Sequence, residues 1–398
     1  MTYKKKRLLY FEILDTINHK NALVITGMRQ VGKTTVMRQI FDKIDEKKIW
    51  FDLDNPLDQK VFEDIDYNNI YRYLESELDL KKNERMFVFI DEIQNFPEIT
   101  KVIKYLIDHY HVKFVVTGSA SFYLKNLFPE SLSGRKFLYQ LDPLSFQEYL
   151  YFHDIKTRKE ISEINIDDAI KPVSLIEYKK YDRYYHEYLG YGGFPEVVVT
   201  KSRKIKKQIL KNIFASFFEK DLRILSDYKD IRELRDLILL LVPRVGSEIQ
   251  VTRLSSELKI SRPKVYEYLE FLQASFFIKL IPKFSKSIDR SVAGGKKVYF
   301  SDNGILRTVG DVNESQLFEN MLSNQLSKYG DVSFYNKRNT AEIDFIVDKR
   351  IAFEVKLTGL KNDLDKVKKI SEKIGIKKSY IVAKKYSEVE GVLSAFRM

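Results

Sequence analysis

The stretch Gly27-Met28-Arg29-Gln30-Val31-Gly32-Lys33-Thr34 follows the pattern G-x-x-x-x-G-K-[ST], and its surroundings decide the fold. Residues 22–26 form an apolar run typical of a buried strand, and residues 34–41 carry apolar side chains at helical spacing. Because the pattern lies between a strand and a helix, it predicts a phosphate-binding loop. A glycine-rich turn that binds nothing is the alternative.

The residue types of this loop suit ATP with a magnesium ion. Glycines let the backbone turn tightly, so that successive N–H groups and the positive end of the helix face one anion. We expect Lys33 to reach the β- and γ-phosphates and the Thr34 hydroxyl to bind magnesium. The predicted nucleotide-binding residues are Gly27, Met28, Arg29, Gln30, Val31, Gly32, Lys33, Thr34, Thr35 and Thr117.

A second apolar run, residues 86–90, ends in Asp91-Glu92. Ligands collect at the carboxyl ends of strands in a parallel sheet, so we expect Asp91 beside the phosphate loop, where it would hold magnesium. Glu92 is the candidate catalytic carboxylate that polarises the attacking water. The alternative is that both acids only cap a helix beginning near Pro97.

A third predicted strand, residues 112–116, ends in small polar residues. Thr117 and Ser119 are candidates for sensing the γ-phosphate, although either hydroxyl also suits the cap of a helix starting near Ser121. Arg135 is a candidate for stabilising the charge on the transferring phosphoryl group, from the same subunit or from a neighbour in a homo-oligomer. A solvated surface arginine is the alternative.

The composition limits the number of domains and the class of protein that the chain can form. The 398 residues favour two or three domains, and a hydrophobic content of 44% is ample for buried cores. Cysteine is absent, and neither a secretion signal nor an apolar run long enough to cross a bilayer is present. We therefore expect a cytoplasmic protein without membrane contact. The basic run at residues 4–7 suits a solvated N-terminus without a function, and the histidines predict no zinc site.

The net charge of +12 is distributed unevenly along the chain. Residues 201–300 contain 22 Lys and Arg against 11 Asp and Glu, whereas residues 1–145 are nearly neutral with 22 against 21. Such a local excess is typical of a nucleic-acid-binding surface. DNA is therefore the predicted partner.

Within this basic segment, residues 251–272 predict a helix-turn-helix. Leu254 and Leu258 mark the inner face of a short helix, and Ser261 is placed to cap a second helix that has Pro263 in its first turn. Two predicted strands follow, joined by a basic loop at residues 282–296, which together make a winged helix. Packing against another domain is the alternative role for such a module.

In the DNA-binding version of a winged helix, the second helix enters the major groove and the wing contacts phosphates. Arg262, Lys264 and also Tyr268 would then face the groove. The predicted wing contacts are Lys283, Lys286 and Arg290.

Near the C-terminus, residues 341–347 and 351–357 alternate polar and apolar side chains around a turn at residues 348–350, which predicts a β-hairpin. Strand alternation places Asp344, Glu354 and Lys356 on polar faces. This arrangement resembles the PD-(D/E)xK nuclease fold. The resemblance implies that Asp344 and Glu354 bind a divalent metal with Glu319 as a further ligand, and that Lys356 activates water. A hairpin with a cross-strand ion pair, or a domain that binds without cutting, is the alternative.

The order of motifs along the chain resembles AAA-type ATPases of bacteria and archaea that carry a C-terminal domain of unknown function. The motifs that carry the resemblance are Gly27–Thr34, Ile90–Gln94, Thr117–Ser119, Leu132–Arg135, Asp142–Phe146, Gly192–Glu196 and the hairpin Glu342–Lys356. The resemblance implies an α/β P-loop core with a parallel sheet, then a winged helix and a restriction-endonuclease-like α/β domain.

We predict four segments: the ATPase domain at residues 1–145, a helical linker or lid at 146–200, the basic winged-helix segment at 201–300 and the nuclease-like domain at 301–398. The linker is rich in tyrosine and net acidic, which favours helix packing over base stacking. Three functions remain open: a DNA-associated ATPase, a nucleotide-controlled switch that binds other proteins, and an ATP-dependent metal nuclease.

Overall fold

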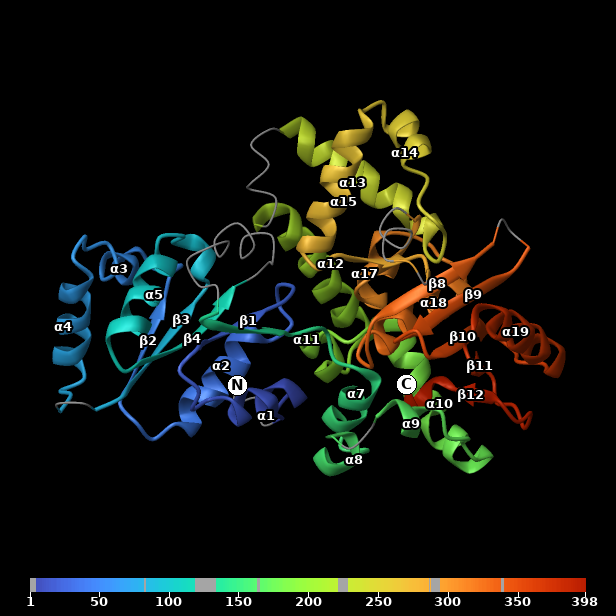
Figure 1. Ribbon diagram of the computed structural model, residues 1–398, viewed down its shortest axis with the longest axis horizontal. Helices are drawn as coiled ribbons and strands as arrows, with labels where there is room; N and C mark the ends of the chain where they lie inside the picture. Colours follow the sequence, from blue (N-terminus) through green and yellow to red (C-terminus); the bar gives the residue numbers. More distant parts are fainter. Residues whose placement is uncertain are drawn as a thin grey trace. The chain divides into compact units, whose positions relative to one another are not determined.

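The computed structural model describes residues 5–81, 84–118, 134–162, 165–220, 228–285, 287, 294–337 and 340–398. The chain divides into two compact units, whose helices and strands are drawn in Figure 1, most of them labelled. Unit 1 comprises Met1–Asp142 with Ala274–Phe276, and unit 2 comprises Pro143–Gln273 and Phe277–Met398.

Unit 1 is built on a five-stranded sheet with the order β2-β3-β4-β1-β5, in which every pairing is parallel. The strands are β1 (Ala22–Thr26), β2 (Lys48–Asp52), β3 (Met86–Asp91), β4 (Val112–Gly118) and β5 (Lys136–Gln140). The strands β1, β3 and β4 are buried along their whole length, as expected for a sheet covered on both faces. Their carboxyl ends meet at one edge, which is where this class of sheet binds ligands.

Helices cover both faces of this sheet. They are α1 (Leu8–Asp15), α2 (Lys33–Lys43), α3 (Pro56–Lys60), α4 (Tyr67–Glu77) and α5 (Ile99–His109). On one face Val88 of β3 packs in a cluster with Leu74 and Ile103 of α4 and α5. On the other face the ring of Phe89 lies 5.1 Å from the ring of Phe41 on α2. The predicted α/β P-loop core is therefore confirmed.

Unit 2 begins with helices that pack around a tyrosine-rich element. These helices are α7 (Phe146–Phe152), α8 (Arg158–Ser162), α9 (Ile166–Ala169), α10 (Leu175–Tyr191), α11 (Pro195–Val199), α12 (Arg203–Lys220) and α13 (Tyr228–Leu241). Tyr185 of α10 is fully buried, and its ring contacts the rings of Phe146 at 5.1 Å and Phe396 at 4.9 Å. The preference for helix packing over base stacking is confirmed for this tyrosine.

The predicted helix pair and strand pair follow in order as α14 (Val251–Leu258), α15 (Arg262–Ala274), β6 (Ile278–Pro282) and β7 (Lys296–Phe300). Leu254 of α14 and Val265 of α15 are buried, and the Ser261 hydroxyl accepts a hydrogen bond from the Lys264 N–H. The strands β6 and β7 pair antiparallel. Short bridges also join Val245 and Glu248 to β7.

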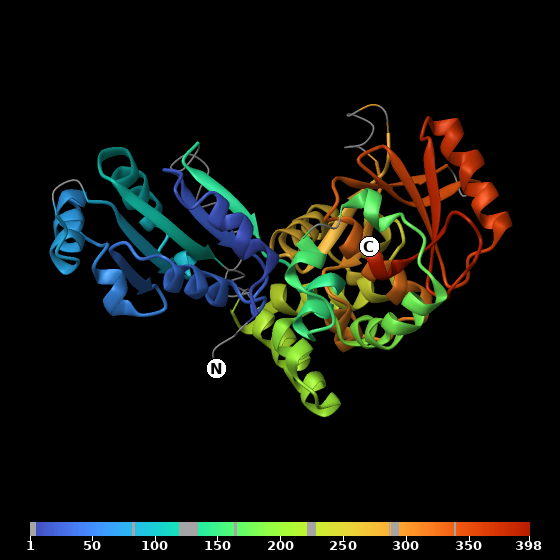
Figure 2. The same ribbon diagram turned by 90° about the horizontal axis from the view of Figure 1, so that it is seen from below.

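The rest of unit 2 holds a mixed sheet with the order β12-β11-β10-β9-β8. Its elements are α17 (Asn303–Val309), α18 (Glu314–Leu326), β8 (Val332–Asn336), β9 (Glu342–Val347), β10 (Ile351–Lys356), α19 (Lys361–Ile374), β11 (Lys378–Ala383) and β12 (Val392–Ser394). The predicted hairpin is β9 and β10, which pair antiparallel. Figure 2 shows α19 lying along this sheet, where it packs mainly on β11. Among the described residues, no helix is long and apolar enough to cross a membrane.

Candidate functional site

The phosphate loop follows the end of β1 and wraps the start of α2. Gly27 has a φ of 145°, and a Cβ atom added there would lie 2.1 Å from the Leu141 carbonyl oxygen. Gly32 has a φ of 100° and occupies the N-cap position of α2. Both positions therefore require glycine, and the tight loop that results is the backbone arrangement that a bound phosphate needs.

Lys33 lies against this loop. Its side chain is buried, and its ammonium nitrogen donates hydrogen bonds to the carbonyl oxygens of Gly27 at 3.1 Å and Met28 at 2.9 Å. The positive charge is thus held beside the N–H groups of the loop, where an anion gains from both.

Arg7 also supports the loop, contrary to the prediction of a solvated basic run. It is only 6% exposed, and its guanidinium donates to the Val31 carbonyl at 3.0 Å and to the Asp142 carbonyl at 2.8 Å. The sequence pattern missed Arg7 because a basic run near a terminus gives no sign that one member is buried.

Asp91, Thr34 and Thr117 come together at the carboxyl edge of the sheet. The Thr117 hydroxyl donates to Asp91 Oδ1, and the Thr34 hydroxyl lies near enough to the Asp91 carboxylate to lower its pKa. Burial raises the pKa of Asp91, while both hydroxyl groups act against that shift. A carboxylate and a hydroxyl at the mouth of the loop are the oxygen ligands that magnesium prefers, so these residues fit the ion.

Glu92 has a left-handed backbone with a φ of 55°. Its N–H donates to Thr117 Oγ1 at 3.1 Å, and the Gln94 side chain donates to its carboxylate. The alternative that Asp91 and Glu92 cap α5 is wrong, because Glu98 holds that position. Thr117 instead ties both acids to β4, and Gln94 is a contact that the sequence did not indicate.

Arg135 lies at the opposite edge of the sheet. Its carbonyl accepts the N–H of Ala22 at the start of β1, whereas the loop follows the end of that strand. Its side chain pairs with Asp108 at 2.6 Å. The structure therefore does not bring Arg135 to the phosphate loop of its own chain, and a role toward a neighbouring subunit stays a prediction. Ser119 lies outside the described residues.

In unit 2, three carboxylates surround one buried lysine; we call Glu319, Glu342, Asp344 and Lys297 the carboxylate cluster. The Lys297 side chain is 3% exposed, and its nitrogen lies 2.8 Å from Glu342, 3.5 Å from Asp344 and 3.8 Å from Glu319. Burial alone lowers the pKa of Lys297, but the fields of Asp344 and Glu319 and the bond to Glu342 outweigh it, so the net shift is upward. Burial also raises the pKa of Glu319.

Glu354 and Lys356 of β10 pair with each other at 2.8 Å, and the Val355 N–H donates to Asp344 Oδ2. Burial raises the pKa of Glu354. In the described part of the chain, no three His, Cys, Asp or Glu side chains form a group that fits a metal ion. Lys297 supplies a positive charge beside Glu319 and Asp344, and the roles of Glu319, Asp344 and Glu354 as metal ligands stay a prediction. Lys297 gave no sequence signal, since its partners lie on later elements.

The predicted DNA-contacting residues differ in their availability. Arg262 is exposed at the start of α15. Lys264, by contrast, forms ion pairs with Asp230 at 3.3 Å and Glu267 at 3.5 Å. The suggestion that Tyr268 faces DNA is wrong, because its ring is fully buried and its hydroxyl bonds Asp230 and Glu233. Lys283 is partly buried. Lys286 and Arg290 lie outside the described residues.

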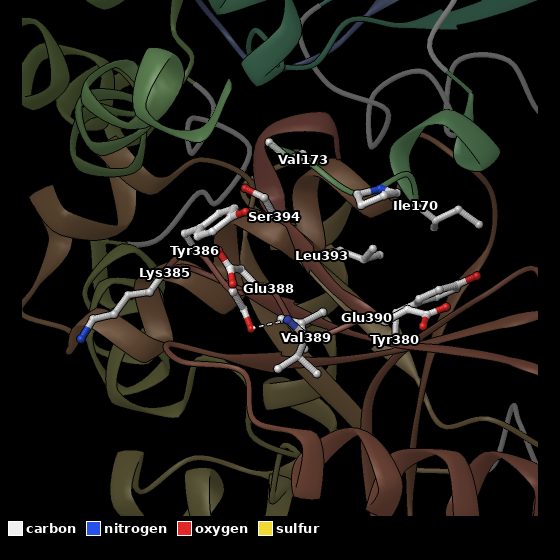
Figure 3. A pocket seen from close by; sticks show the side chains of 14 residues that line it. Ile170, Val173, Tyr380, Lys385, Tyr386, Glu388, Val389, Glu390, Leu393 and Ser394 are labelled. Atoms are coloured by element: carbon white, nitrogen blue, oxygen red, sulfur yellow. Dashed lines mark hydrogen bonds between the residues drawn. The ribbon is translucent and has the colours of Figure 1, made fainter. Parts of the chain in front are cut away.

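A hollow of about 460 Å³ lies beside β12, away from the residues predicted from sequence (Figure 3). Tyr380, Tyr386, Glu388 and Ser394 are among its lining residues. None of the predicted site residues lines it.

Comparisons with known proteins divide the chain into three parts. Residues 19–150 match the family model described as an AAA domain, while residues 182–316 and 314–394 match two separate domains of unknown function. An uncharacterised protein of Methanocaldococcus jannaschii is 28% identical over 86% of this chain and 76% of its own length. An uncharacterised protein of Haemophilus influenzae is 27% identical over 88% and 86%.

Similar solved structures include a Walker-type ATPase of Pyrococcus abyssi, with 15% identity, a TM-score of 0.42 and coverage of 75% of this chain and 94% of that one. Another is the RuvB Holliday junction branch migration motor of Thermotoga maritima, with 14% identity, a TM-score of 0.32 and coverage of 77% and 95%. The family-model match coincides with the parallel sheet and phosphate loop of unit 1. The chain thus carries an AAA-type P-loop ATPase-like domain, followed by two domains of unknown function.

Proposed function

We propose that this protein hydrolyses ATP with magnesium and that it does so in association with DNA. The observation that carries the ATPase proposal is the set of bonds at the edge of the sheet. Thr117 accepts the Glu92 N–H and donates to Asp91, and so joins both acids, while Thr34 at the start of α2 lies near the Asp91 carboxylate. A phosphate loop alone binds a nucleotide, but paired acids beside it supply what hydrolysis needs.

Each residue of the site has its own role in the proposed hydrolysis. The loop N–H groups and Lys33 bind the phosphates, and Thr34 with Asp91 would hold magnesium, which neutralises charge developing on the phosphates. Glu92 orients and polarises the attacking water. Thr117 and Gln94 are positioning residues, because each acts through its hydrogen bond to Glu92.

A Lys33→Ala variant tests the nucleotide half of the proposal. We expect its ATP binding and turnover to be lost, since the charge beside the loop is removed. The exposed Lys43, at the end of the same helix, provides the control Lys43→Ala. If Lys33→Ala hydrolyses ATP as fast as the wild type, ATP is not hydrolysed at this phosphate loop.

The DNA half rests on the basic segment 201–300 and on the helix pair α14 and α15 with the strands β6 and β7. Arg262 is the best-placed residue of α15 for a nucleic-acid contact, because it is exposed whereas Lys264 is already paired. We expect Arg262→Glu to weaken binding of duplex DNA about tenfold or more, measured by fluorescence anisotropy. Arg235→Glu, an exposed position on α13, is the control. Equal binding by both variants would contradict a role for α15.

Two other functions stay as alternatives with their own tests. If the protein is a switch that binds other proteins, ATP binding persists while no DNA is bound. If it is a metal-dependent nuclease, Glu354→Ala and Lys356→Ala abolish cutting of branched, single-stranded or duplex DNA in the presence of magnesium or manganese. Wild-type inactivity on all three substrates would remove the nuclease alternative.

A further inference from the structure

The helix α12 carries the highest density of basic residues in the segment. Residues 201–220 contain seven Lys and Arg against one acid, Glu219. By comparison, the helix pair and its flanks at residues 251–275 contain four against three. The charge that predicts nucleic-acid binding therefore lies mostly outside the helix-turn-helix, on α12 and on residues 276–300, which contain six against one.

Four of these cations form one exposed side of α12, which we call the α12 basic face: Arg203, Lys204, Lys207 and Lys211. At about 100° per residue they fall within an arc of about 100°. Ile209, Ile213 and Phe217 occupy a different side and are buried in unit 2. The apolar side of the helix thus anchors it, and the basic face is turned to solvent.

The cations of the α12 basic face are not neutralised within the chain. Among the described residues, none of the four side chains forms a hydrogen bond or an ion pair. Lys206 on the same helix behaves differently, because it is buried and lies 3.2 Å from Glu187. On the neighbouring α11, Glu196 is an exposed acid, and no ion pair joins it to the face. Four uncompensated charges on one rigid helix are an unusual surface, since exposed cations are commonly interspersed with acids.

The α12 basic face also belongs to the same packed body as the helix pair. The ring of Phe217 lies 4.5 Å from Phe277, just before β6, and 6.3 Å from Phe271 of α15. A ligand held by α12 is therefore attached rigidly to the part of the chain from which Arg262 projects.

We propose that the α12 basic face binds the phosphate backbone of duplex DNA, an inference that rests on the DNA association proposed above. The four residues span about 12 Å of helix, which is enough to meet several phosphates, because each strand carries one phosphate per about 3.4 Å of the duplex axis. Contacts of this kind position a duplex without reading its sequence. A membrane surface is a poorer match, because Ile209, Ile213 and Phe217 of α12 are buried in the protein. Ile205 is the exposed large apolar residue of α12 among the described residues, and it lies outside the arc of the four cations.

The test is the salt dependence of DNA binding by the full-length protein. The variant replaces Arg203, Lys204, Lys207 and Lys211 with glutamine. Its matched control replaces Lys361, Lys366, Lys368 and Lys369, which are four exposed lysines of α19 in the same unit. Binding of a labelled random-sequence duplex is measured by anisotropy from 50 to 200 mM salt, with vesicles of anionic phospholipid as a second probe.

We expect the slope of log affinity against log salt to fall by about 3 to 4 in the α12 variant. Between 50 and 200 mM salt, the wild type then loses about 100-fold more affinity than the variant does. The α19 variant keeps most of the wild-type slope, and basal ATP turnover is unchanged in both.

Three results would overturn the inference. If the slope of log affinity against log salt falls equally in the α12 and α19 variants, the loss of net charge explains the effect and α12 is not a DNA-binding site. If the α12 variant loses vesicle binding but keeps DNA binding, the face serves a membrane. If the wild type binds no duplex at 50 mM salt, the proposed DNA association and the role of α12 are both wrong. If the wild type binds duplex and the α12 variant binds it with the same affinity and salt dependence, only the role of α12 is wrong.

Discussion

Two buried cations, Arg7 and Lys297, are the residues whose roles the structure changes most. Each carries a full positive charge into a largely solvent-free position, which is favourable only when hydrogen bonds and opposite charges compensate. Arg7 is compensated by backbone carbonyls beside the phosphate loop, and Lys297 by three carboxylates. Their removal should therefore have different consequences.

Replacing Arg7 with alanine should loosen the phosphate loop without touching the reacting atoms. We expect the KM for ATP to rise about tenfold while kcat changes less, because two charge-assisted bonds that hold Val31 and Asp142 are lost. Steady-state ATPase kinetics measure this split. Arg72→Ala, an exposed arginine on α4, is the control. A lower melting temperature with unchanged KM would show that Arg7 only anchors the N-terminus.

Replacing Lys297 with methionine leaves three carboxylates without their common cation. We expect the free energy of unfolding of unit 2 to fall by about 3 to 5 kcal/mol, since breaking a buried ion pair strands the remaining charges. The loss should be smaller at pH 5 than at pH 8, because protonation of the acids relieves their repulsion. Denaturant titration at both pH values measures it, with the exposed neighbour in Lys296→Met as the control. An equal loss at both pH values would mean that packing, not charge, is what Lys297 provides.

At the level of elements, the sequence predicted those strands, turns and helix caps that depend on residues close together in the chain. The apolar runs that became β1 and β3, the β9–β10 hairpin and the Ser261 cap were all visible as period, turn or cap signals. The fold of unit 1 and the nucleotide site followed from them, because parallel strands bring their carboxyl ends together. The contacts of Lys297 could not be predicted, since its partners lie on α18 and β9, and no sequence pattern reports such distant pairing.

Arg135 does not reach the phosphate loop of its own chain, for a related reason. Its motif lies close in sequence to other site motifs, but the parallel pairing of β5 with β1 puts the start of β5 at the edge away from the loop. Direction along a strand, rather than proximity in sequence, decides which edge a residue reaches.

The N-terminus of α17 provides a pH-dependent test of packing between elements. Asp302 caps this helix by accepting the N–H groups of Gly304 and Ile305, and it also accepts the Gly193 N–H at 2.7 Å. Burial outweighs these bonds and raises the pKa of Asp302 to about 6. The protonated form is therefore favoured in the folded state, and stability is lost as the pH rises from about 4 through 6.

We expect the free energy of unfolding of the wild type, taken relative to Asp302→Asn, to fall by about 3 kcal/mol between pH 4 and pH 7. Subtracting the variant removes the contribution of other titrating groups. If the free energy of unfolding relative to Asp302→Asn instead rises with pH, the three N–H donors outweigh burial in setting the pKa of Asp302.

In the whole molecule, the distribution of charge separates the two proposed activities. The nearly neutral unit 1 contains the nucleotide site, and unit 2 contains the basic residues of the segment 201–300 other than those outside the described residues. If the two activities are linked, DNA should change the rate of ATP turnover. We expect duplex DNA to stimulate turnover severalfold at low salt, and neutralisation of the α12 basic face to remove that stimulation without changing the basal rate. Stimulation that survives neutralisation would place the DNA contact elsewhere.

In the proposed function, Asp91 and Glu92 make the phosphate loop a hydrolytic site. This role is tested most directly by measuring ATP binding and ATP turnover side by side for the wild type and for Glu92→Gln. We predict that the variant binds ATP as the wild type does but turns it over about 100-fold or more slowly, because the general base is lost. A wild type that binds ATP without hydrolysing it, or a variant with undiminished turnover, would contradict the claim.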